Sequence, residues 1–544
     1  MILNDNMNLF CSPPFSKTRL RGAKRTFGAA AILTGLVLAV SVPAATAEVL
    51  YRNPVIAGDH PDPSIIRVGN DYWASSTASA WGPIFPLLHS TDLVNWELTG
   101  SVLPHRPGWA TDDFWAPEIS EFKGRFYVYY VARQRNGLLS VAVATAEKPG
   151  GPYIDHGPII AQADGSIDPF PVTDTNGVRY LVWKEDGNSQ QKPTPIWAQP
   201  LNDDGTQLVG EKHELIHNDT KWEGGVVEGP CIIRHGDWFY LFYSGNGCCG
   251  TGCHYALGVA RSHSLLGPWE KNPMNPILAA NDAWKCPGHG TVITDPEGRY
   301  WLLYHAYSAT GSIFTGREGM LDEVKFQANG WPTINDNNGP SQQAPSPLGV
   351  TQKVFGVSYA DDFNSANLES GWQWPQHHEP VYRLKDGELR LSSPSHGANM
   401  AAAVLARSTT RADYVATTVI DTRGLKPGAT VGLCAFGDWQ NALGIAYGDG
   451  QIITWHREKG ASRILAQQPA PVAEKLYLQL TARHGCDFQL AVSTNGEKWI
   501  PCGPPAEAKD LPPWDRGVRV ALTVGGVAEA QGRFDSFSIK PLEP

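Results

Sequence analysis

Between residues 62 and 303 the chain repeats one pattern of apolar and polar positions five times. Each copy begins with a charged or aromatic residue, continues with alternating apolar positions, passes through a glycine-containing turn and ends in an aromatic second run. The copies begin at Asp62, Trp115, Asp168, Glu228 and His289. Alternation with period two on both sides of a turn predicts a β-hairpin in every copy.

Repeats of about 50 to 60 residues built from strands are typical of β-propellers, whose units bury their faces only against their neighbours. Five copies predict five blades, in an all-β chain where helical periodicity is hard to find. The first strand of each blade lies closest to the axis. We therefore expect the residues that begin the five copies to meet around one mouth of the propeller.

A composition change marks the end of this first domain, which we place at residues 48–335. Residues 336–358 begin with a run rich in Asn, Gly, Pro, Ser and Gln that cannot form a core. Such a composition predicts a linker.

Short alternating runs return from about Tyr359, without the hairpin repeat. Runs such as 430–436 and 476–482 have the length and spacing of an antiparallel β-sandwich, which we place at residues 359–544. The segments 361–363 and 534–539 are expected to pair as its first and last strands.

The first 47 residues have the pattern of an export signal. Five basic residues between Lys17 and Arg25 precede an apolar run over 27–42, and Ala-Thr-Ala at 45–47 has the form of a signal-peptidase site. The apolar run is short for a helix that crosses a bilayer, which needs roughly 20 residues. We predict a signal peptide at 1–47 and an exported chain, periplasmic or extracellular; an uncleaved N-terminal anchor is the alternative.

Net charge narrows the class of partner. The formal charge is −10, and it becomes −14 when the five basic residues and the single acid, Asp5, of the predicted signal are removed. An acidic chain without a basic cluster is a poor candidate for nucleic acid or anionic membrane. We expect no nucleic acid partner and no membrane association after signal cleavage, whereas neutral polymers fit.

Eight of the nine cysteines remain after Cys11 leaves with the signal, and an even count in an exported protein suggests disulfides. Five lie in the first domain and three in the second, so each domain keeps an unpaired thiol or one bridge joins the two. The segment 248–254 contains three cysteines and a histidine. Its spacing does not match the usual zinc clusters, so a disulfide-stapled loop is the better interpretation.

Three carboxylates at one mouth indicate an enzyme, because their repulsion raises at least one pKa and costs stability. Glycosidic bond cleavage needs one carboxylic acid and one carboxylate, about 6.5 to 9.5 Å apart in the inverting arrangement. Asp62 and Glu228 can fill these roles from opposed blades. Asp168 can hold the pKa of the acid up by like-charge proximity. A turn-capping role is the alternative for any single aspartate.

These residues stand in motifs that resemble, in the same order, those of glycoside hydrolase family 43. The motifs span about residues 50–335 and read His60-Pro-Asp62-Pro-Ser64, Trp115-Ala-Pro117, Ser166-Ile-Asp168-Pro169, Glu228-Gly-Pro230 and Gly288-His289-Gly290. The resemblance implies an inverting enzyme on a five-bladed propeller, in the β-xylosidase and α-L-arabinofuranosidase branch. It implies Asp62 as general base, Glu228 as general acid and Asp168 as the residue that tunes and orients the acid.

The resemblance also suggests residues that bind substrate. His289 corresponds to a histidine that faces an axial calcium or sodium ion, or water, so we expect no required cofactor and leave open a structural ion held through water. Arg317 resembles an arginine that hydrogen-bonds sugar hydroxyls; a surface pair with Glu318 is the alternative. Trp81 and Trp115 are candidates for stacking on a pentose, with blade packing as the alternative for Trp81.

The second domain resembles the concanavalin-like β-sandwich of family 43 β-xylosidases, where a loop can close one side of the pocket. A closed pocket accepts a chain end or a side branch. The alternative is a carbohydrate-binding module with a platform of Trp372, Trp374 and Trp439.

We therefore predict a secreted inverting glycoside hydrolase that releases terminal xylosyl or arabinofuranosyl units from hemicellulose oligosaccharides of xylan, arabinan or arabinoxylan. An endo-arabinanase of the same fold and a non-catalytic carbohydrate-binding propeller are the alternatives. Fructoside-cleaving propellers fit less well, because they use an Asn-Asp-Pro-Asn-Gly type motif where this chain has His-Pro-Asp-Pro-Ser at 60–64. The sequence does not separate xylose from arabinofuranose.

Overall fold

The computed structural model describes residues 48–309, 313–353, 355–356, 358–394 and 399–542. The predicted signal peptide at 1–47 lies outside them. Nearly all regular structure in this part of the chain is β-strand, and its helical elements are three single 3-10 turns: η1 (Asn188–Gln190), η2 (Lys221–Glu223) and η3 (Asn335–Asn337). None of these helices has the length and apolar character that a bilayer crossing requires.

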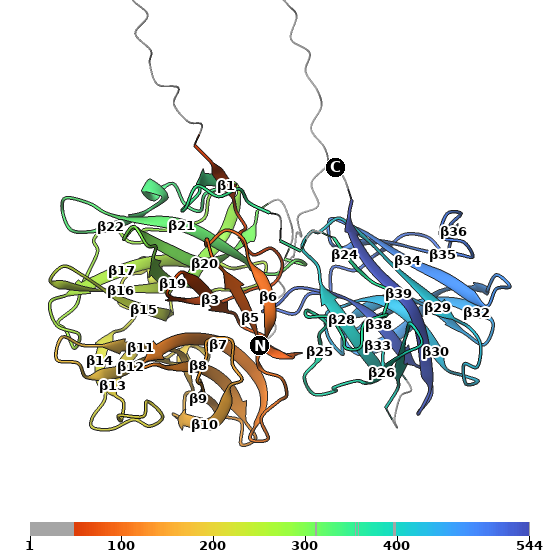
Figure 1. Cartoon of the computed structure of the whole chain (residues 1–544), viewed down its shortest axis with the longest axis horizontal. Coiled ribbons are helices and arrows are strands. Elements are labelled where there is room, and N and C mark those ends of the chain that lie inside the picture. The colour runs from red at the N-terminus through yellow and green to blue at the C-terminus, as the bar shows by residue number, and fades with distance from the viewer. Residues whose placement is uncertain (1–47, 310–312, 354, 357, 395–398, 543–544) are drawn as a thin grey trace, which may run out of the picture.

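Five four-stranded antiparallel sheets form the N-terminal lobe, drawn from red to green in Figure 1. Within each sheet the strands follow the order of the chain. The sheets are β2 (Ser64–Val68), β3 (Asp71–Ser75), β5 (Ile84–Ser90) and β6 (Glu97–Leu103); β7 (Ala110–Phe122), β8 (Arg125–Gln134), β9 (Leu139–Ala146) and β10 (Ile154–Ile160); β11 (Ser166–Thr173), β12 (Arg179–Glu185), β13 (Ile196–Pro200) and β14 (His213–Ile216); β15 (Val227–His235), β16 (Trp238–Gly245), β17 (Ala256–Ser262) and β18 (Glu270–Lys271); β19 (Trp284–Thr294), β20 (Tyr300–Ser308), β21 (Glu318–Phe326) and β22 (Pro332–Ile334).

The first strands of the five sheets contact one another in a ring. Strand β2 contacts β7, β7 contacts β11, β11 contacts β15, β15 contacts β19, and β19 returns to β2. A sheet packed between two neighbours has no solvent face, and accordingly all eight residues of β9 are buried. The residues near the start of each first strand are thereby brought to a common centre.

The two ends of this lobe are tied together. Strand β1 (Leu50–Arg52) pairs with β23 (Gln343–Pro345), and the backbone of Ile56 bridges to Gly319 in β21. The segment predicted as a linker therefore packs back on the sheets. Within it, the carbonyl oxygens of Asn338 and Pro340 accept hydrogen bonds from the Asn281 side chain at 3.1 and 2.9 Å.

The C-terminal lobe, cyan to blue in Figure 1, contains two antiparallel sheets. One consists of β24 (Tyr359–Asp361), β26 (Val381–Lys385), β27 (Glu388–Ser392), β29 (Tyr414–Asp421), β34 (Lys475–Arg483), β35 (Asp487–Ser493), β36 (Ile500–Pro501), β37 (Ala506–Glu507) and β39 (Gln531–Pro541). The other consists of β28 (Ala403–Ser408), β30 (Thr430–Phe436), β31 (Ala442–Gly448), β32 (Gln451–Glu458), β33 (Ala461–Pro469) and β38 (Arg519–Gly525).

Alternating side chains build the core between these two sheets. In β34, Leu476, Leu478, Leu480 and Ala482 are fully buried, and the residues between them are partly exposed. This is the period-two pattern of a sheet with one buried face. The predicted pairing of the first and last strands is confirmed, since β24 pairs with β39 and Asp361 lies opposite Phe537.

The two lobes share a polar and aromatic interface. The short strand β4 (Trp81–Gly82) of the propeller lobe pairs with β25 (Trp374–Pro375) of the sandwich, which Figure 1 shows between the two lobes. Asp59 accepts hydrogen bonds through Oδ2 from the Arg519 guanidinium at 2.7 Å and from the Gly517 amide at 3.0 Å. The Asp59 and Arg519 side chains are 3% and 4% exposed, so water does not screen the pair.

Replacement of Arg519 by Met should weaken this interface. The change leaves the Asp59 carboxylate buried without its ionic partner, which costs about 3 kcal/mol or more. Urea unfolding followed by tryptophan fluorescence should show an earlier first transition. The matched control is Lys385→Met, because Lys385 is 58% exposed and 3.9 Å from Asp386, and such a pair contributes less than about 1 kcal/mol. Equal midpoints for the two variants would contradict the expectation.

Candidate active site

A left-handed residue marks each of the five first strands or the residues just before it. These residues are Asp62, Ala116, Asp168, Gly229 and His289, with φ of 52°, 43°, 56°, 59° and 39°. Strand pairing shifts register next to the last four of them. Such bulges bend a strand and redirect its side chains, and they occur often beside active sites.

This shared conformation corrects the alignment of the repeats. Ala116 and Gly229 are the positions equivalent to Asp62, Asp168 and His289. Trp115 and Glu228 stand one residue earlier, although the sequence pattern placed them at the head of their copies. A one-residue offset changes the direction of a side chain, because the side chains of neighbouring residues in a bulge point in different directions.

One cavity of about 580 Å³ collects nearly all the predicted site residues. Its lining includes Asp62, Trp115, Asp168, Glu228, His289 and Arg317 from the propeller lobe. Trp514 and Asp515 of the sandwich also line it. The cavity is therefore built by both domains.

Both carboxylate oxygens of Asp62 accept hydrogen bonds. Oδ1 accepts a hydrogen bond from the Arg317 guanidinium at 2.9 Å, and Oδ2 accepts one from the Thr77 hydroxyl at 2.7 Å. The Thr77 hydroxyl in turn accepts from the backbone amide of Ala116 at 2.7 Å. The carboxylate orientation is thus fixed by the segment after β3, which β7 holds in place, and by the residue before β21.

The acidity of Asp62 follows from these neighbours. Burial by itself raises its pKa, but the positive charge of Arg317, together with smaller contributions that include His289, outweighs burial, and the pKa lies well below the usual carboxyl range. Asp62 is consequently ionised at any ordinary working pH.

His305 contacts the backbone of Asp62 as a neutral ring. Burial, with Arg317 nearby, lowers its pKa to about 4. Its Nδ1 accepts a hydrogen bond from the backbone amide of Asp62 at 3.0 Å. The proton of the neutral imidazole is therefore on Nε2.

Arg317 is buried rather than paired on the surface. It is 4% exposed, and besides Asp62 it donates to the carbonyl oxygen of Asp515 at 3.1 Å. The alternative of a surface pair with Glu318 is wrong, because Glu318 is also buried and accepts from the Gly58 amide. Arg317 thus links the Asp62 carboxylate to the sandwich.

Asp168 connects to the residue that follows Glu228. Its Oδ2 accepts a hydrogen bond from the Gly229 amide at 2.9 Å. His289 lies between the two aspartates, with Nδ1 at 3.5 Å from Asp62 Oδ1 and 3.8 Å from Asp168 Oδ2. An added Cβ on Gly229 would lie 2.9 Å from the His289 ring, so only glycine permits this approach.

Lys184 is a site residue that the sequence interpretation missed. Its ammonium donates to Glu228 Oε2 at 2.7 Å, to Asp186 at 2.8 Å and to Asn188 at 3.0 Å. The side chain is 1% exposed. A lysine directly after the apolar run 181–183, opposite Ile167 in the hairpin that carries Asp168, was the available signal.

The pKa values of the two remaining carboxyls diverge. Burial, with the negative charge of Glu228 beside it, raises the pKa of Asp168 to about 6. Burial also acts to raise the pKa of Glu228, but the Lys184 ammonium outweighs it and the pKa is lowered. The direction for Glu228 is opposite to the one expected for a general acid, and the pair takes its first proton on Asp168.

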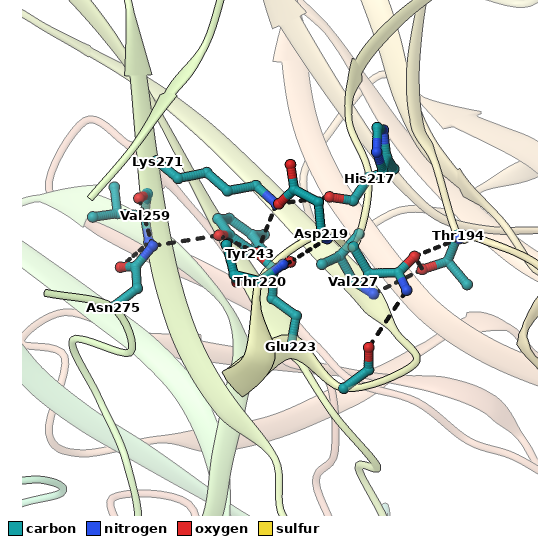
Figure 2. A network of polar contacts seen from close by, with 12 residues as sticks. Thr194, His217, Asp219, Thr220, Glu223, Val227, Tyr243, Val259, Lys271 and Asn275 are labelled. Atoms are coloured by element: carbon teal, nitrogen blue, oxygen red, sulfur yellow. Dashed lines mark hydrogen bonds and ion pairs between the residues drawn. The ribbon is translucent and has the colours of Figure 1, made fainter. Parts of the chain in front are cut away.

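A polar network supports the loop that leads to Glu228 (Figure 2). The fully buried Glu223 accepts through Oε1 from the Tyr243 hydroxyl and the Lys271 ammonium, both at 2.7 Å. Its Oε2 accepts from two backbone amides of its own loop. Just beyond, the Val227 amide donates to the Thr194 hydroxyl at 2.8 Å. These bonds anchor the backbone on the N-terminal side of Glu228.

The predicted aromatic platforms are placed differently from one another. Trp115 lines the cavity and meets Trp514 edge-on, with ring centroids 6.1 Å apart. Trp81 does not line it, so its expected stacking on a sugar is wrong. Trp81 is 2% exposed and packs against Phe436 of the sandwich, because β4 lies in the interface between the lobes.

The three tryptophans proposed for a sandwich platform do not line one surface: Trp372 and Trp374 line a second cavity of about 210 Å³, and Trp439 does not. Trp372 is buried and donates to Asp361 at 2.8 Å. Trp374 lies in the interface strand β25, and Trp439 packs edge-on against Phe436. This geometry gives no flat sugar-binding surface from the three residues together.

Four propeller cysteines form two bridges, Cys248–Cys249 and Cys253–Cys286. The segment 248–254 is thus a stapled loop, as predicted. The thiols outside these bridges are buried: Cys231, Cys434, Cys486 and Cys502. Each domain keeps at least one unbridged thiol, which is one of the two arrangements left open by the sequence.

A directly bound axial ion finds few ligands. His289 contributes one ring nitrogen, and the carboxylates closest to it are Asp62 and Asp168, which already accept hydrogen bonds. Among the described residues, the group of three whose ligand atoms lie close enough to hold an ion is Cys486, Asp487 and Glu507 of the sandwich.

Comparison with known proteins decides the family. The model of "Glycosyl hydrolases family 43" matches residues 51–332, which include every propeller residue of the cavity. The chain belongs to glycoside hydrolase family 43. It is thus a glycoside hydrolase. A model described as "Beta xylosidase C-terminal Concanavalin A-like domain" matches residues 360–519.

Family 43 relatives resemble the chain over both lobes. "Xylosidase/arabinosidase 43B" of Humicola insolens is 28% identical over 539 residues, which cover 90% of this chain and 98% of the relative. "Non-reducing end alpha-L-arabinofuranosidase BoGH43B" of Bacteroides ovatus is 29% identical over 66% of this chain and 68% of its own. The GH43 BlXynB protein of Bacillus licheniformis has a similar structure, with a TM-score of 0.79, 26% identity and coverage of 91% and 100% of the two chains.

Proposed function

We propose that this hydrolase removes terminal β-D-xylosyl or α-L-arabinofuranosyl units from hemicellulose oligosaccharides, with inversion at the anomeric carbon. The observation that carries the proposal is one cavity lined by Asp62 and Glu228, which come from sheets that are not neighbours and have different cationic partners. Relatives named as xylosidases and arabinofuranosidases support the pentose assignment.

In this mechanism Asp62 is the general base. Its low pKa keeps it ionised, and it accepts a proton from a water molecule whose oxygen bonds to the anomeric carbon. Glu228 is the general acid and transfers its proton to the glycosidic oxygen as that bond breaks. The proton lost by Glu228 and the one gained by Asp62 balance the hydrolysis.

Asp168 is the residue that supplies the proton to Glu228 and orients Glu228. It carries the raised pKa of the carboxyl pair and bonds to the Gly229 amide directly after Glu228. The proton must reach Glu228 before the bond breaks, and the approach of the glycosidic oxygen, as a hydrogen-bond acceptor, favours the protonated form of Glu228. Lys184 opposes this protonation in the free enzyme.

Action on chain ends is supported by the sandwich. Trp514 and Asp515 line the cavity together with the propeller residues, so the second domain contributes a wall where an endo-acting enzyme needs an open groove. Arg317, fixed between Asp62 and the Asp515 carbonyl, is placed to donate to hydroxyls of the terminal sugar.

The remaining assignments belong to the same proposal. The five sheets, whose first strands form a ring, are the five blades of a closed propeller. Residues 1–47 direct export to the periplasm or the medium. An axial calcium or sodium ion, if bound, is held by His289 through water and has a structural role.

Amide substitution of the two reacting carboxyls should separate their roles. Asp62→Asn and Glu228→Gln should each lower kcat/KM on pentosyl oligosaccharides by about 10³-fold or more while the variants still fold, as circular dichroism would show. A dinitrophenyl pentoside, whose leaving group needs no proton, should restore turnover in Glu228→Gln and not in Asp62→Asn. Unchanged oligosaccharide turnover in either variant would end the assignment.

The stereochemistry of the first product tests the inverting mechanism. Proton NMR during the first minutes of hydrolysis should show a pentose whose anomeric configuration is opposite to that of the substrate. Retention would instead require a covalent glycosyl-enzyme and would exclude a water molecule activated by Asp62.

The pH dependence of kcat/KM should follow the coupled carboxyls. Activity should fall as pH rises above about 6, where the Asp168–Glu228 pair loses its proton, and should show no acid limb in the usual carboxyl range, because Asp62 stays ionised. Lys184→Met should move the alkaline limb to higher pH, since Lys184 lowers the pKa of both carboxyls. The control Lys192→Met removes a half-exposed lysine bonded to Asp164 and should leave the limb in place. A limb unmoved by Lys184→Met would contradict this account.

A further inference from the structure

The disulfide between the adjacent residues Cys248 and Cys249 lines the cavity. The stabilisation that a disulfide gives grows with the length of chain it encloses, because it restricts the unfolded state. Cys253–Cys286 encloses a separation of 33 residues, whereas Cys248–Cys249 joins neighbours. The adjacent bridge therefore contributes little to stability, and its place in the cavity calls for another explanation.

The bridge stands on the acid side of the cavity. In the hairpin of β15 and β16, Glu228 pairs with Ser244, and the chain leaves β16 at Gly245. The next four residues, 246–249, all line the cavity. The leaving sugar must lie next to the acid that protonates its oxygen. The Cys248–Cys249 loop therefore adjoins the space that the leaving sugar occupies.

The loop that carries the bridge is fixed at several points. The Asn246 amide donates to the carbonyl oxygen of Val226, two residues before Glu228, at 3.2 Å. The Gly250 amide donates to the Tyr307 hydroxyl at 3.3 Å. On the sandwich side, a Cβ added to Gly250 would lie 3.5 Å from the Trp514 carbonyl oxygen. The bridge and Trp514 thus belong to one continuous rim.

The size of the cavity leaves room for a second sugar. A pentosyl unit has about ten non-hydrogen atoms and displaces less than the roughly 300 Å³ that ten water molecules occupy. The cavity volume is about 580 Å³. Disulfide sulfur is polarisable and accepts hydrogen bonds weakly, so it presents an apolar surface that suits the C–H face of a sugar ring.

We propose that the Cys248–Cys249 disulfide is the wall against which the leaving sugar of an oligosaccharide packs, and that it sets the preference of this enzyme for sugar leaving groups. The inference rests on the proposed function, because it uses Glu228 as the acid.

The test compares two substrates that differ in their leaving group. A pentosyl fluoride, β-D-xylosyl or α-L-arabinofuranosyl, releases fluoride and places no sugar against the wall. The matching oligosaccharide, xylobiose or an arabinofuranosyl-substituted xylo-oligosaccharide, does. In Cys248→Ser/Cys249→Ser the ratio of kcat/KM for the oligosaccharide to kcat/KM for the fluoride should fall about tenfold, the effect of losing a small apolar contact.

The matched control is Cys253→Ser/Cys286→Ser, which removes a bridge whose cysteines do not line the cavity. It should lower the unfolding midpoint and keep the ratio of the unchanged protein. Mild reduction of this control variant breaks Cys248–Cys249 without altering its residues and should reproduce the fall in ratio, even if the double serine variant folds poorly.

Two results would overturn the inference: an unchanged ratio in Cys248→Ser/Cys249→Ser, or alkylation of both cysteines by iodoacetamide in the native, unreduced protein. Failure of the proposed function would look different, because neither the fluoride nor the oligosaccharide would then be hydrolysed by the unchanged enzyme.

Discussion

The arrangement of this protein depends on three largely buried carboxylates that line one cavity. The side chains of Asp62, Asp168 and Glu228 are 10%, 7% and 13% exposed, and their cationic neighbours are Arg317 beside Asp62 and Lys184 beside Glu228. A buried carboxylate without its partner costs several kcal/mol. The sheets that supply the cations must therefore close around those that supply the anions, which links closure of the lobe to the electrostatics of the site.

The same constraint gives chemically similar groups different acidity. Asp62 accepts hydrogen bonds from Arg317 and Thr77 and stays ionised, whereas burial, together with the charge of Glu228, raises the pKa of Asp168 to about 6. Hydrolysis of a glycosidic bond needs such a separation between an acid and a base. Here it results from burial and from which charge stands beside which carboxylate, and not from residue type.

The sandwich participates in this balance. Asp59, three residues before Asp62, is bonded to Arg519 and Gly517 of the second domain, and Arg317 reaches from Asp62 to the Asp515 carbonyl. Trp514, although 62% exposed, lies on the cavity rim with Trp115. The second domain is thus part of the site, because its Asp515 carbonyl accepts a hydrogen bond from Arg317, which also donates to Asp62.

The sequence alone determined the all-β class, the five repeated hairpins, the sandwich with its paired first and last strands, and the carboxylates of the site. Local periodicity and motif order carry that information, since alternation and turns are written in neighbouring residues. Only the tertiary structure placed Lys184 beside Glu228, removed Trp81 from the site, shifted Trp115 and Glu228 by one residue relative to the other copies, and paired Cys248 with Cys249. The positions of Lys184 and Trp81 depend on contacts between residues far apart in the chain, and the offset of Trp115 and Glu228 depends on a bulge that changes direction without changing the pattern. The pairing of Cys248 with its neighbour was one of several that the count of cysteines allowed.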